Sequence, residues 1–111
     1  MEYQIEEYVT AKGESPYADW FEGLKDTVAR AKLLARIDRA AHGNFGDWKA
    51  LAGAKGVFEM RENHGPGYRI FYGIVERRIV LLLAGSTKKG QNRAIAKAKE
   101  YFADYETRTK K

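Results

Sequence analysis

The chain has 111 residues, a length typical of one domain, so we expect a single domain over residues 1–111. It contains no cysteine, which excludes a disulfide framework, a thiolate metal site and a cysteine nucleophile. Hydrophobic residues make up 44% and charged residues 32%, a mixture typical of globular rather than disordered chains. No apolar run approaches the roughly 18 residues of a membrane span, and the N-terminus lacks a signal-peptide pattern. We therefore expect a cytoplasmic protein without membrane contact.

The net charge of +5 is distributed unevenly along the chain. Residues 1–29 contain seven acids and two bases, whereas residues 30–111 contain 18 bases and eight acids. Such an asymmetry favours a polyanionic partner, with nucleic acid ahead of a membrane surface. A domain that is basic without binding any polyanion is the alternative that charge alone leaves open.

Helices dominate the predicted elements in the first half of the chain. Apolar residues alternate over residues 3–10, which predicts a first strand. Ser15 and Pro16 then form a strong helix start, a hydroxyl N-cap followed by proline at the first helical position, and this short helix ends near residue 24. A second helix is predicted for residues 27–41, where apolar residues recur at three- and four-residue spacing.

Strands dominate the second half. They are predicted at residues 48–51, 57–62, 68–75 and 79–84, with a five-residue hairpin loop at 63–67 and a last helix at 91–105. The fourth of these strands is nearly all aliphatic, as a strand buried on both faces would be. The element order β-α-α-β-β-β-β-α predicts an α+β domain with a mostly antiparallel sheet.

The positions of two arginines are the most informative chemical feature. If the hairpin closes so that Glu62 faces Tyr68, Arg61 lies opposite Arg69, and Glu59 lies on the same face. Like charges directly opposite one another destabilise a strand pair, and a phosphate between the two guanidinium groups would remove that cost. The alternative is that each arginine pairs with a nearby carboxylate, that of Glu59 or Glu62.

Further residues are candidates for contacts with RNA. Lys88 and Lys89 lie in the polar loop after the aliphatic strand, where they suit phosphate contacts or are merely solvated, and Lys49 has the same status. Tyr72 is one of the strand aromatics that either stack on unpaired bases or fill the core. His64, in the hairpin loop, is a candidate acid or base near neutral pH, although a loop histidine is often incidental. The chain has no P-loop, dinucleotide fingerprint or HExxH motif, so we expect neither a metal nor a cofactor.

Several segments of this chain resemble the RelE/ParE toxin superfamily, and most closely its HigB-like "addiction module killer protein" branch. The similarity covers about residues 8–106. The motifs that carry it are Arg36-Ile37-Asp38-Arg39, Gly43-Asn44-Phe45-Gly46-Asp47, Val57-Phe58-Glu59-Met60-Arg61, Gly65-Pro66-Gly67-Tyr68-Arg69-Ile70-Phe71-Tyr72 and Ile79-Val80-Leu81-Leu82-Leu83, with the Gly85…Lys88…Gln91 loop and the Tyr101-Phe102…Tyr105 ending.

This resemblance implies the toxin of a type II toxin–antitoxin pair. The implied fold has two N-terminal helices packed on one side of a curved antiparallel sheet of four or five strands, with a C-terminal helix. Many relatives are endoribonucleases that cut mRNA, often on the ribosome, whereas ParE-type relatives inhibit DNA gyrase. The implied partner is an antitoxin, commonly a helix-turn-helix protein. The family's basic residues carry over onto Arg61, Arg69 and Lys88.

The leading hypothesis is therefore a metal-independent mRNA endonuclease that inhibits translation. Arg61 and Arg69 would stabilise the charge that develops on the phosphate, and Glu59 would be the base that takes the proton of the 2′-hydroxyl. Lys88, Tyr72 or His64 would protonate the leaving oxygen. A gyrase inhibitor without catalytic activity, and an inactive toxin-fold partner of an antitoxin, are the alternatives that the sequence leaves open.

Overall fold

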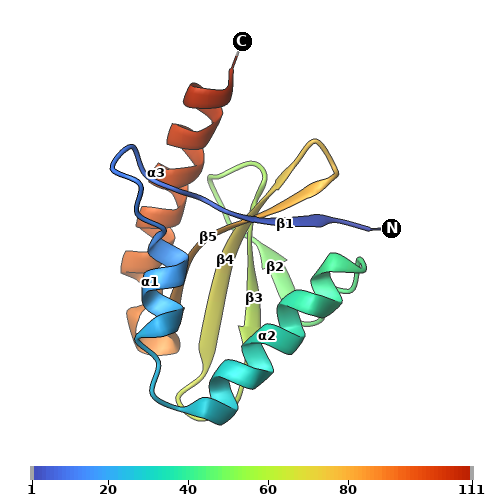
Figure 1. The fold of residues 1–111 in the computed structure, drawn as a ribbon, viewed down its shortest axis with the longest axis vertical. Coiled ribbons are helices and arrows are strands. Elements are labelled where there is room, and N and C mark those ends of the chain that lie inside the picture. The colour runs from blue at the N-terminus through green and yellow to red at the C-terminus, as the bar shows by residue number, and fades with distance from the viewer. Residues whose placement is uncertain (1, 111) are drawn as a thin grey trace.

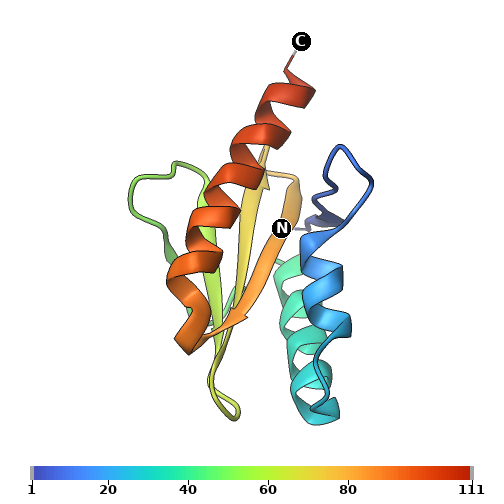
Figure 2. The ribbon, with the colours of Figure 1, turned by 90° about the vertical axis from the view of Figure 1, so that its left-hand side faces the viewer.

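The computed structural model describes residues 2–110 and places a sheet between two layers of helices (Figures 1 and 2). The elements in chain order are β1 (Gln4–Glu7), α1 (Pro16–Glu22), α2 (Thr27–Ala41), β2 (Trp48–Ala50), β3 (Val57–Glu62), β4 (Tyr68–Val75), β5 (Ile79–Thr87), a 3₁₀ turn (Lys88–Gly90) and α3 (Gln91–Thr109). Within this described part of the chain, no helix is long and apolar enough to cross a bilayer.

The five strands form one sheet in the order β1-β5-β4-β3-β2. β1 runs parallel to β5, and the other neighbouring strands are antiparallel. Helices α1 and α2 cover one face of the sheet, and α3 crosses the other (Figure 2). The predicted α+β fold, with two N-terminal helices, a mostly antiparallel sheet and a C-terminal helix, is confirmed.

The two N-terminal helices begin where their capping residues predict. Ser15 Oγ accepts a hydrogen bond of 3.2 Å from the Ala18 amide, and Pro16 occupies the first helical position. Asp26 caps α2 by accepting hydrogen bonds of 3.0 and 3.1 Å from the amides of Val28 and Ala29. The side-chain oxygens thus satisfy amides that have no partner inside the helix.

Each face of the sheet has its own core, because successive side chains of a strand point to opposite faces. Ile70 and Tyr72 of β4 pack on the α1 and α2 side together with Leu33 of α2. Phe71, between them, packs on the α3 side together with Phe102. β4 and β5 are therefore buried on both faces, as the aliphatic run of β5 predicts.

Six element boundaries differ from the sequence prediction, two of them, the start of β1 and the end of β2, by one residue. β1 ends at Glu7 and α1 ends at Glu22, each a few residues earlier than expected. β5 continues to Thr87, since a bulge between its pairings with Phe71 and Tyr72 lets the strand remain paired with β4. α3 continues to Thr109, because its last turns are fastened by side chains: Arg108 forms an ion pair of 2.9 Å with Asp104 and donates to the Val9 carbonyl.

Helix α3 approaches the sheet closely at a glycine. A Cβ built on Gly73 of β4 would overlap the ring of Phe102, which is 5% exposed. The ring thus lies directly on the backbone of β4, and this contact sets how closely α3 packs on the sheet.

We expect Gly73→Ala to lower the free energy of unfolding by about 1–3 kcal/mol, because the added methyl overpacks a filled core. Gly23→Ala is the matched control, since Gly23 has a right-handed helical conformation and a Cβ there would make ordinary contacts of 3.5 Å. Urea unfolding followed by circular dichroism measures both. Equal midpoints for the two variants would contradict the packing argument.

Candidate functional site

The predicted register of the β3–β4 hairpin is confirmed. Glu62 pairs with Tyr68, and Arg61 pairs with Arg69 on the neighbouring strand. Arg69 pairs in turn with Ser86 of β5. Arg61, Arg69 and Ser86 therefore form one row across three strands, on the face of the sheet that α3 crosses.

The carboxylate of Glu59 lies between the two guanidinium groups. Its Oε2 accepts a hydrogen bond of 3.2 Å from Arg61 Nε and lies 3.1 Å from Arg69 Nε, where the geometry is that of an ion pair rather than a hydrogen bond. The side chains of Glu59, Arg69 and Arg61 are 4%, 10% and 31% exposed. The alternative in which the arginines pair with a carboxylate is thus confirmed for Glu59, and the cluster of three keeps one net positive charge.

The backbone of Arg61 is held from two sides while its side chain reaches solvent. Its amide donates a hydrogen bond of 2.9 Å to the Asp47 carbonyl, and its carbonyl accepts one from the Arg36 guanidinium of α2. That guanidinium fills the space where Gly46, with φ at +60°, would carry a Cβ. Arg61 is therefore fixed in position and still has free donors on its outer edge.

Two of the candidate lysines lie beside elements that carry this cluster. Lys49 of β2 pairs with Glu59, so its side chain lies beside Glu59 at the exposed edge of the sheet. The Lys88 amide donates a hydrogen bond of 3.0 Å to the Gly67 carbonyl, two residues before Arg69 in the chain. A Cβ built on Gly67 would lie 3.6 Å from Lys88 Cβ, so Lys88 lies beside the residue that precedes β4, at the end of the strand that carries Arg69.

Other sequence candidates lie elsewhere. Tyr72 is 2% exposed on the opposite face and stacks on Phe45 and Phe58 with centroid distances of 5.5 and 5.7 Å. Burial raises the pKa of its hydroxyl. Alternation along β4 thus turns Tyr72 into the core on the face opposite the arginine cluster, and its role in RNA contact or proton donation stays a prediction. Lys89 is exposed in the 3₁₀ turn, and the structure gives it no contact with the arginine cluster.

His64 joins the hairpin loop to α2. Its Nε2 lies 3.0 Å from Oδ2 of Asp26, the N-cap of that helix. This contact fastens the hairpin loop to the N-terminus of α2, and the predicted role of His64 in RNA binding or proton transfer stays a prediction.

Two residues at the site were missed as candidates. Ser86 is 8% exposed, and its Oγ has no hydrogen-bond partner among the described residues. Arg36 contacts the Arg61 carbonyl from a helix that precedes β3 by sixteen residues or more. The polar loop that contains Ser86 suits phosphate contacts, which is a signal for that residue. Arg36 belongs to a motif of the family resemblance, but its contact with Arg61 has no sequence signal, because the partner is a backbone atom distant in the sequence.

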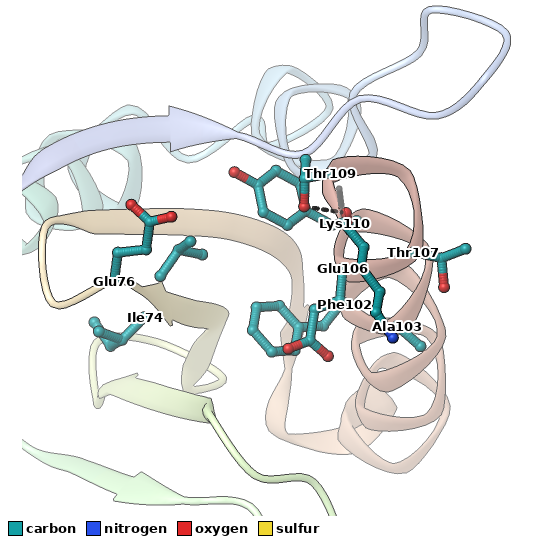
Figure 3. Close-up of a pocket in the computed structure, with 10 residues that line it drawn as sticks. Ile74, Glu76, Phe102, Ala103, Glu106, Thr107, Thr109 and Lys110 are labelled. Carbon is teal, nitrogen blue, oxygen red and sulfur yellow. Dashed lines mark hydrogen bonds between the residues drawn. The ribbon is translucent and has the colours of Figure 1, made fainter.

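The arginine cluster suits an anion better than a metal ion. A guanidinium fork matches the oxygens of a phosphate, and Lys49 and Lys88 add positive charge beside the elements that carry the cluster. Residues 2–110 contain no group of three or more His, Asp or Glu placed to hold a metal. A hollow of about 690 Å³ lies between the β4–β5 hairpin and the end of α3, but the carboxylates of Glu76 and Glu106 line it, which does not suit a phosphate (Figure 3).

The fold is that of a known toxin. A mutant of E. coli toxin RelE in the free state superposes with a TM-score of 0.66 at 16% sequence identity, covering 90% of this chain and 97% of that one. This agreement bears out the resemblance to the RelE/ParE superfamily at the level of the fold.

The sequence comparison defines the family. The family described as "Phage derived protein Gp49-like (DUF891)" matches residues 19–103, and the chain belongs to this family. An uncharacterized protein of Haemophilus influenzae is 40% identical over 83 residues, which are 75% of this chain and 82% of that protein.

We expect Glu59→Gln to lower the free energy of unfolding by about 3 kcal/mol, because it leaves two facing guanidinium groups without their buried counter-charge. Added inorganic phosphate should restore stability in this variant more than in the wild type, since an anion can take the place of the carboxylate. Thermal unfolding with and without phosphate measures both effects, with exposed Glu22→Gln as the control. An equal response of wild type and variant to phosphate would refute an anion site here.

We expect the Asp26 cap to make stability depend on pH in the acid range. The Ala29 amide, then His64, lowers the pKa of the Asp26 carboxyl below its usual 3.8. Such a carboxylate stabilises the fold above pH about 4, and this contribution disappears as the pH falls through its folded-state pKa. Asp26→Asn retains a capping oxygen that does not titrate, so its unfolding midpoint should fall less steeply below pH about 4 than the wild type's. Asp38→Asn on the same helix should keep the wild-type slope.

Proposed function

We propose that this protein is the toxin of a type II toxin–antitoxin module, of the HigB-like kind, and that it cleaves mRNA without a metal ion. The observation that carries this proposal is the facing pair Arg61 and Arg69, held by a buried carboxylate on a basic face of the sheet. The RelE-like fold supports the same conclusion.

The reaction that suits this site is an internal transesterification. The ribose 2′-oxygen attacks the adjacent phosphorus in line and loses its proton to a solvent water, and the bond to the 5′-oxygen breaks. The products are a 2′,3′-cyclic phosphate and a 5′-hydroxyl. Negative charge grows on the phosphate oxygens in the transition state, where Arg61 and Arg69 stabilise it. Such electrostatic stabilisation is worth most in a partly buried site, where water screens the charges least.

Glu59 positions the arginines in this proposal. With 4% of its side chain exposed and Oε2 engaged by both guanidinium groups, it is poorly placed to take a proton from a 2′-hydroxyl. Lys88 is the proposed acid that protonates the leaving 5′-oxygen. Its backbone is held beside Gly67, two residues before Arg69.

The proposed partners in the cytoplasm are mRNA, either free or on the ribosome, and an antitoxin of the helix-turn-helix type. The basic residues 30–111 suit the polyanion. The acidic residues 1–29, which include α1, offer a separate surface for contacts with protein.

We expect Arg61→Ala to lower the cleavage rate at least about a hundredfold, because it removes a donor that acts in the transition state. The measurement is brief induction in bacteria with transcriptome-wide mapping of new mRNA 5′ ends, and Arg77→Ala, in the exposed β4–β5 turn, is the control. Circular dichroism verifies that both variants fold.

Three other results of this experiment would each lead to a different conclusion about function. Full cleavage by folded Arg61→Ala would refute the assignment of this site. Growth arrest by the wild type without new 5′ ends would favour a gyrase inhibitor of the ParE type. The absence of arrest would favour an inactive partner of an antitoxin.

A further inference from the structure

Half of strand β5 has an open edge. β1 pairs with β5 from Ile79 to Leu82, and the Tyr8 amide adds a hydrogen bond of 2.9 Å to the Leu82 carbonyl. β5 itself continues to Thr87, beyond the reach of β1. Figure 2 shows this lower part of β5 facing the viewer between α3 and α1. An open strand edge presents backbone donors and acceptors to a further strand.

A groove of about 430 Å³ follows this edge. Its floor is the segment 84–87 of β5, and its walls come from α1 on one side and α3 on the other. The wall residues are Pro16, Trp20, Arg93, Ala94, Lys97 and Tyr101. The indole of Trp20 lies directly on the backbone of Gly85, where a Cβ would overlap the ring, so the α1 wall is flat and apolar.

The α3 wall of the groove is positively charged. Arg93 and Lys97 are both exposed and are the charged residues that line the groove within the described chain. Lys97 Nζ lies 3.8 Å from Glu100, a surface contact between exposed side chains that contributes little. Ser86, on the floor, has a buried Oγ with no hydrogen-bond partner among residues 2–110.

We propose that this groove binds an extended, acidic segment of a partner protein, which pairs with residues 84–87 as a sixth strand. Alternate side chains of an added strand point to opposite faces of the sheet. The segment that fits has acidic side chains facing Arg93 and Lys97 and apolar side chains against Trp20. The open edge favours protein over RNA, because a nucleic acid has no backbone amides with which to continue the sheet.

The groove is separate from the arginine cluster. Ser86 pairs with Arg69, which pairs with Arg61, so an added strand lies two strands away from Arg69 and three from Arg61. A partner held in this groove therefore leaves the outer edge of Arg61 open unless a further part of it reaches across α3.

The binding partner used to test this inference is the antitoxin encoded in the same operon. The inference therefore rests on the proposed function. Hydrogen exchange of residues 84–87 is compared between the free chain and the complex, where the added strand should slow it at least about tenfold. The double variant R93E/K97Q should weaken the complex about tenfold through lost charge complementarity. R77E/R78Q, at the exposed turn at the other end of β5, removes the same charge and should leave affinity unchanged. Glutamate in the first turn of α3 suits the helix dipole, so R93E should fold.

A complex with unchanged exchange at residues 84–87, or equal losses of affinity in both double variants, would overturn the inference. Failure of the antitoxin to bind at all would overturn it too. The proposed nuclease activity is measured separately from new mRNA 5′ ends, so cleavage without a groove complex would refute the docking site and leave the nuclease standing.

Discussion

The arrangement of this site depends on a single buried carboxylate between two facing arginines. Arg61 and Arg69 lie opposite one another on neighbouring strands, which is unfavourable unless an anion lies between them. Glu59, two residues before Arg61 on β3, supplies that anion. Its Oε2 lies within ion-pair distance of both guanidinium groups. Because burying a lone carboxylate is costly, each of the three side chains needs the other two. The result is a preorganised positive site whose geometry does not rely on a bound ligand.

The two faces of the sheet differ in the residues that they carry. The α1 and α2 face is filled by aromatic residues, among them Tyr72 and Phe58, and is fastened at the hairpin loop by the contact of His64 with Asp26. On the other face, α3 packs on the core that contains Phe71 and Phe102. The arginine row lies on this same face. Charge follows the same division, because the acidic residues concentrate in the segment that forms β1 and α1.

Much of this arrangement could be predicted from the sequence because it is local. The bounds of α2 and the register that pairs Arg61 with Arg69 follow from a capping aspartate and a five-residue hairpin loop. Contacts between distant segments could not be predicted. The face to which Tyr72 turns depends on which side of the sheet the helices cover, and the Arg36 contact with the Arg61 carbonyl joins residues 25 positions apart through a backbone atom that carries no sequence signal.

The bulge in β5 determines which residue stands next to Arg69. The pairing passes from Leu82 with Tyr72 to Ala84 with Phe71, so Leu83 has no direct partner and the alternation beyond it is reversed. In an uninterrupted ladder Arg69 would face Gly85, and Ser86 would lie opposite Tyr68, on the side of Trp20. The extra residue thus places the hydroxyl of Ser86, in place of a glycine hydrogen, beside the guanidinium. The polarity of the surface beside Arg69 therefore depends on the register of β5 as well as on its residues. A shift of the pairing by one residue would change which side chain the guanidinium meets.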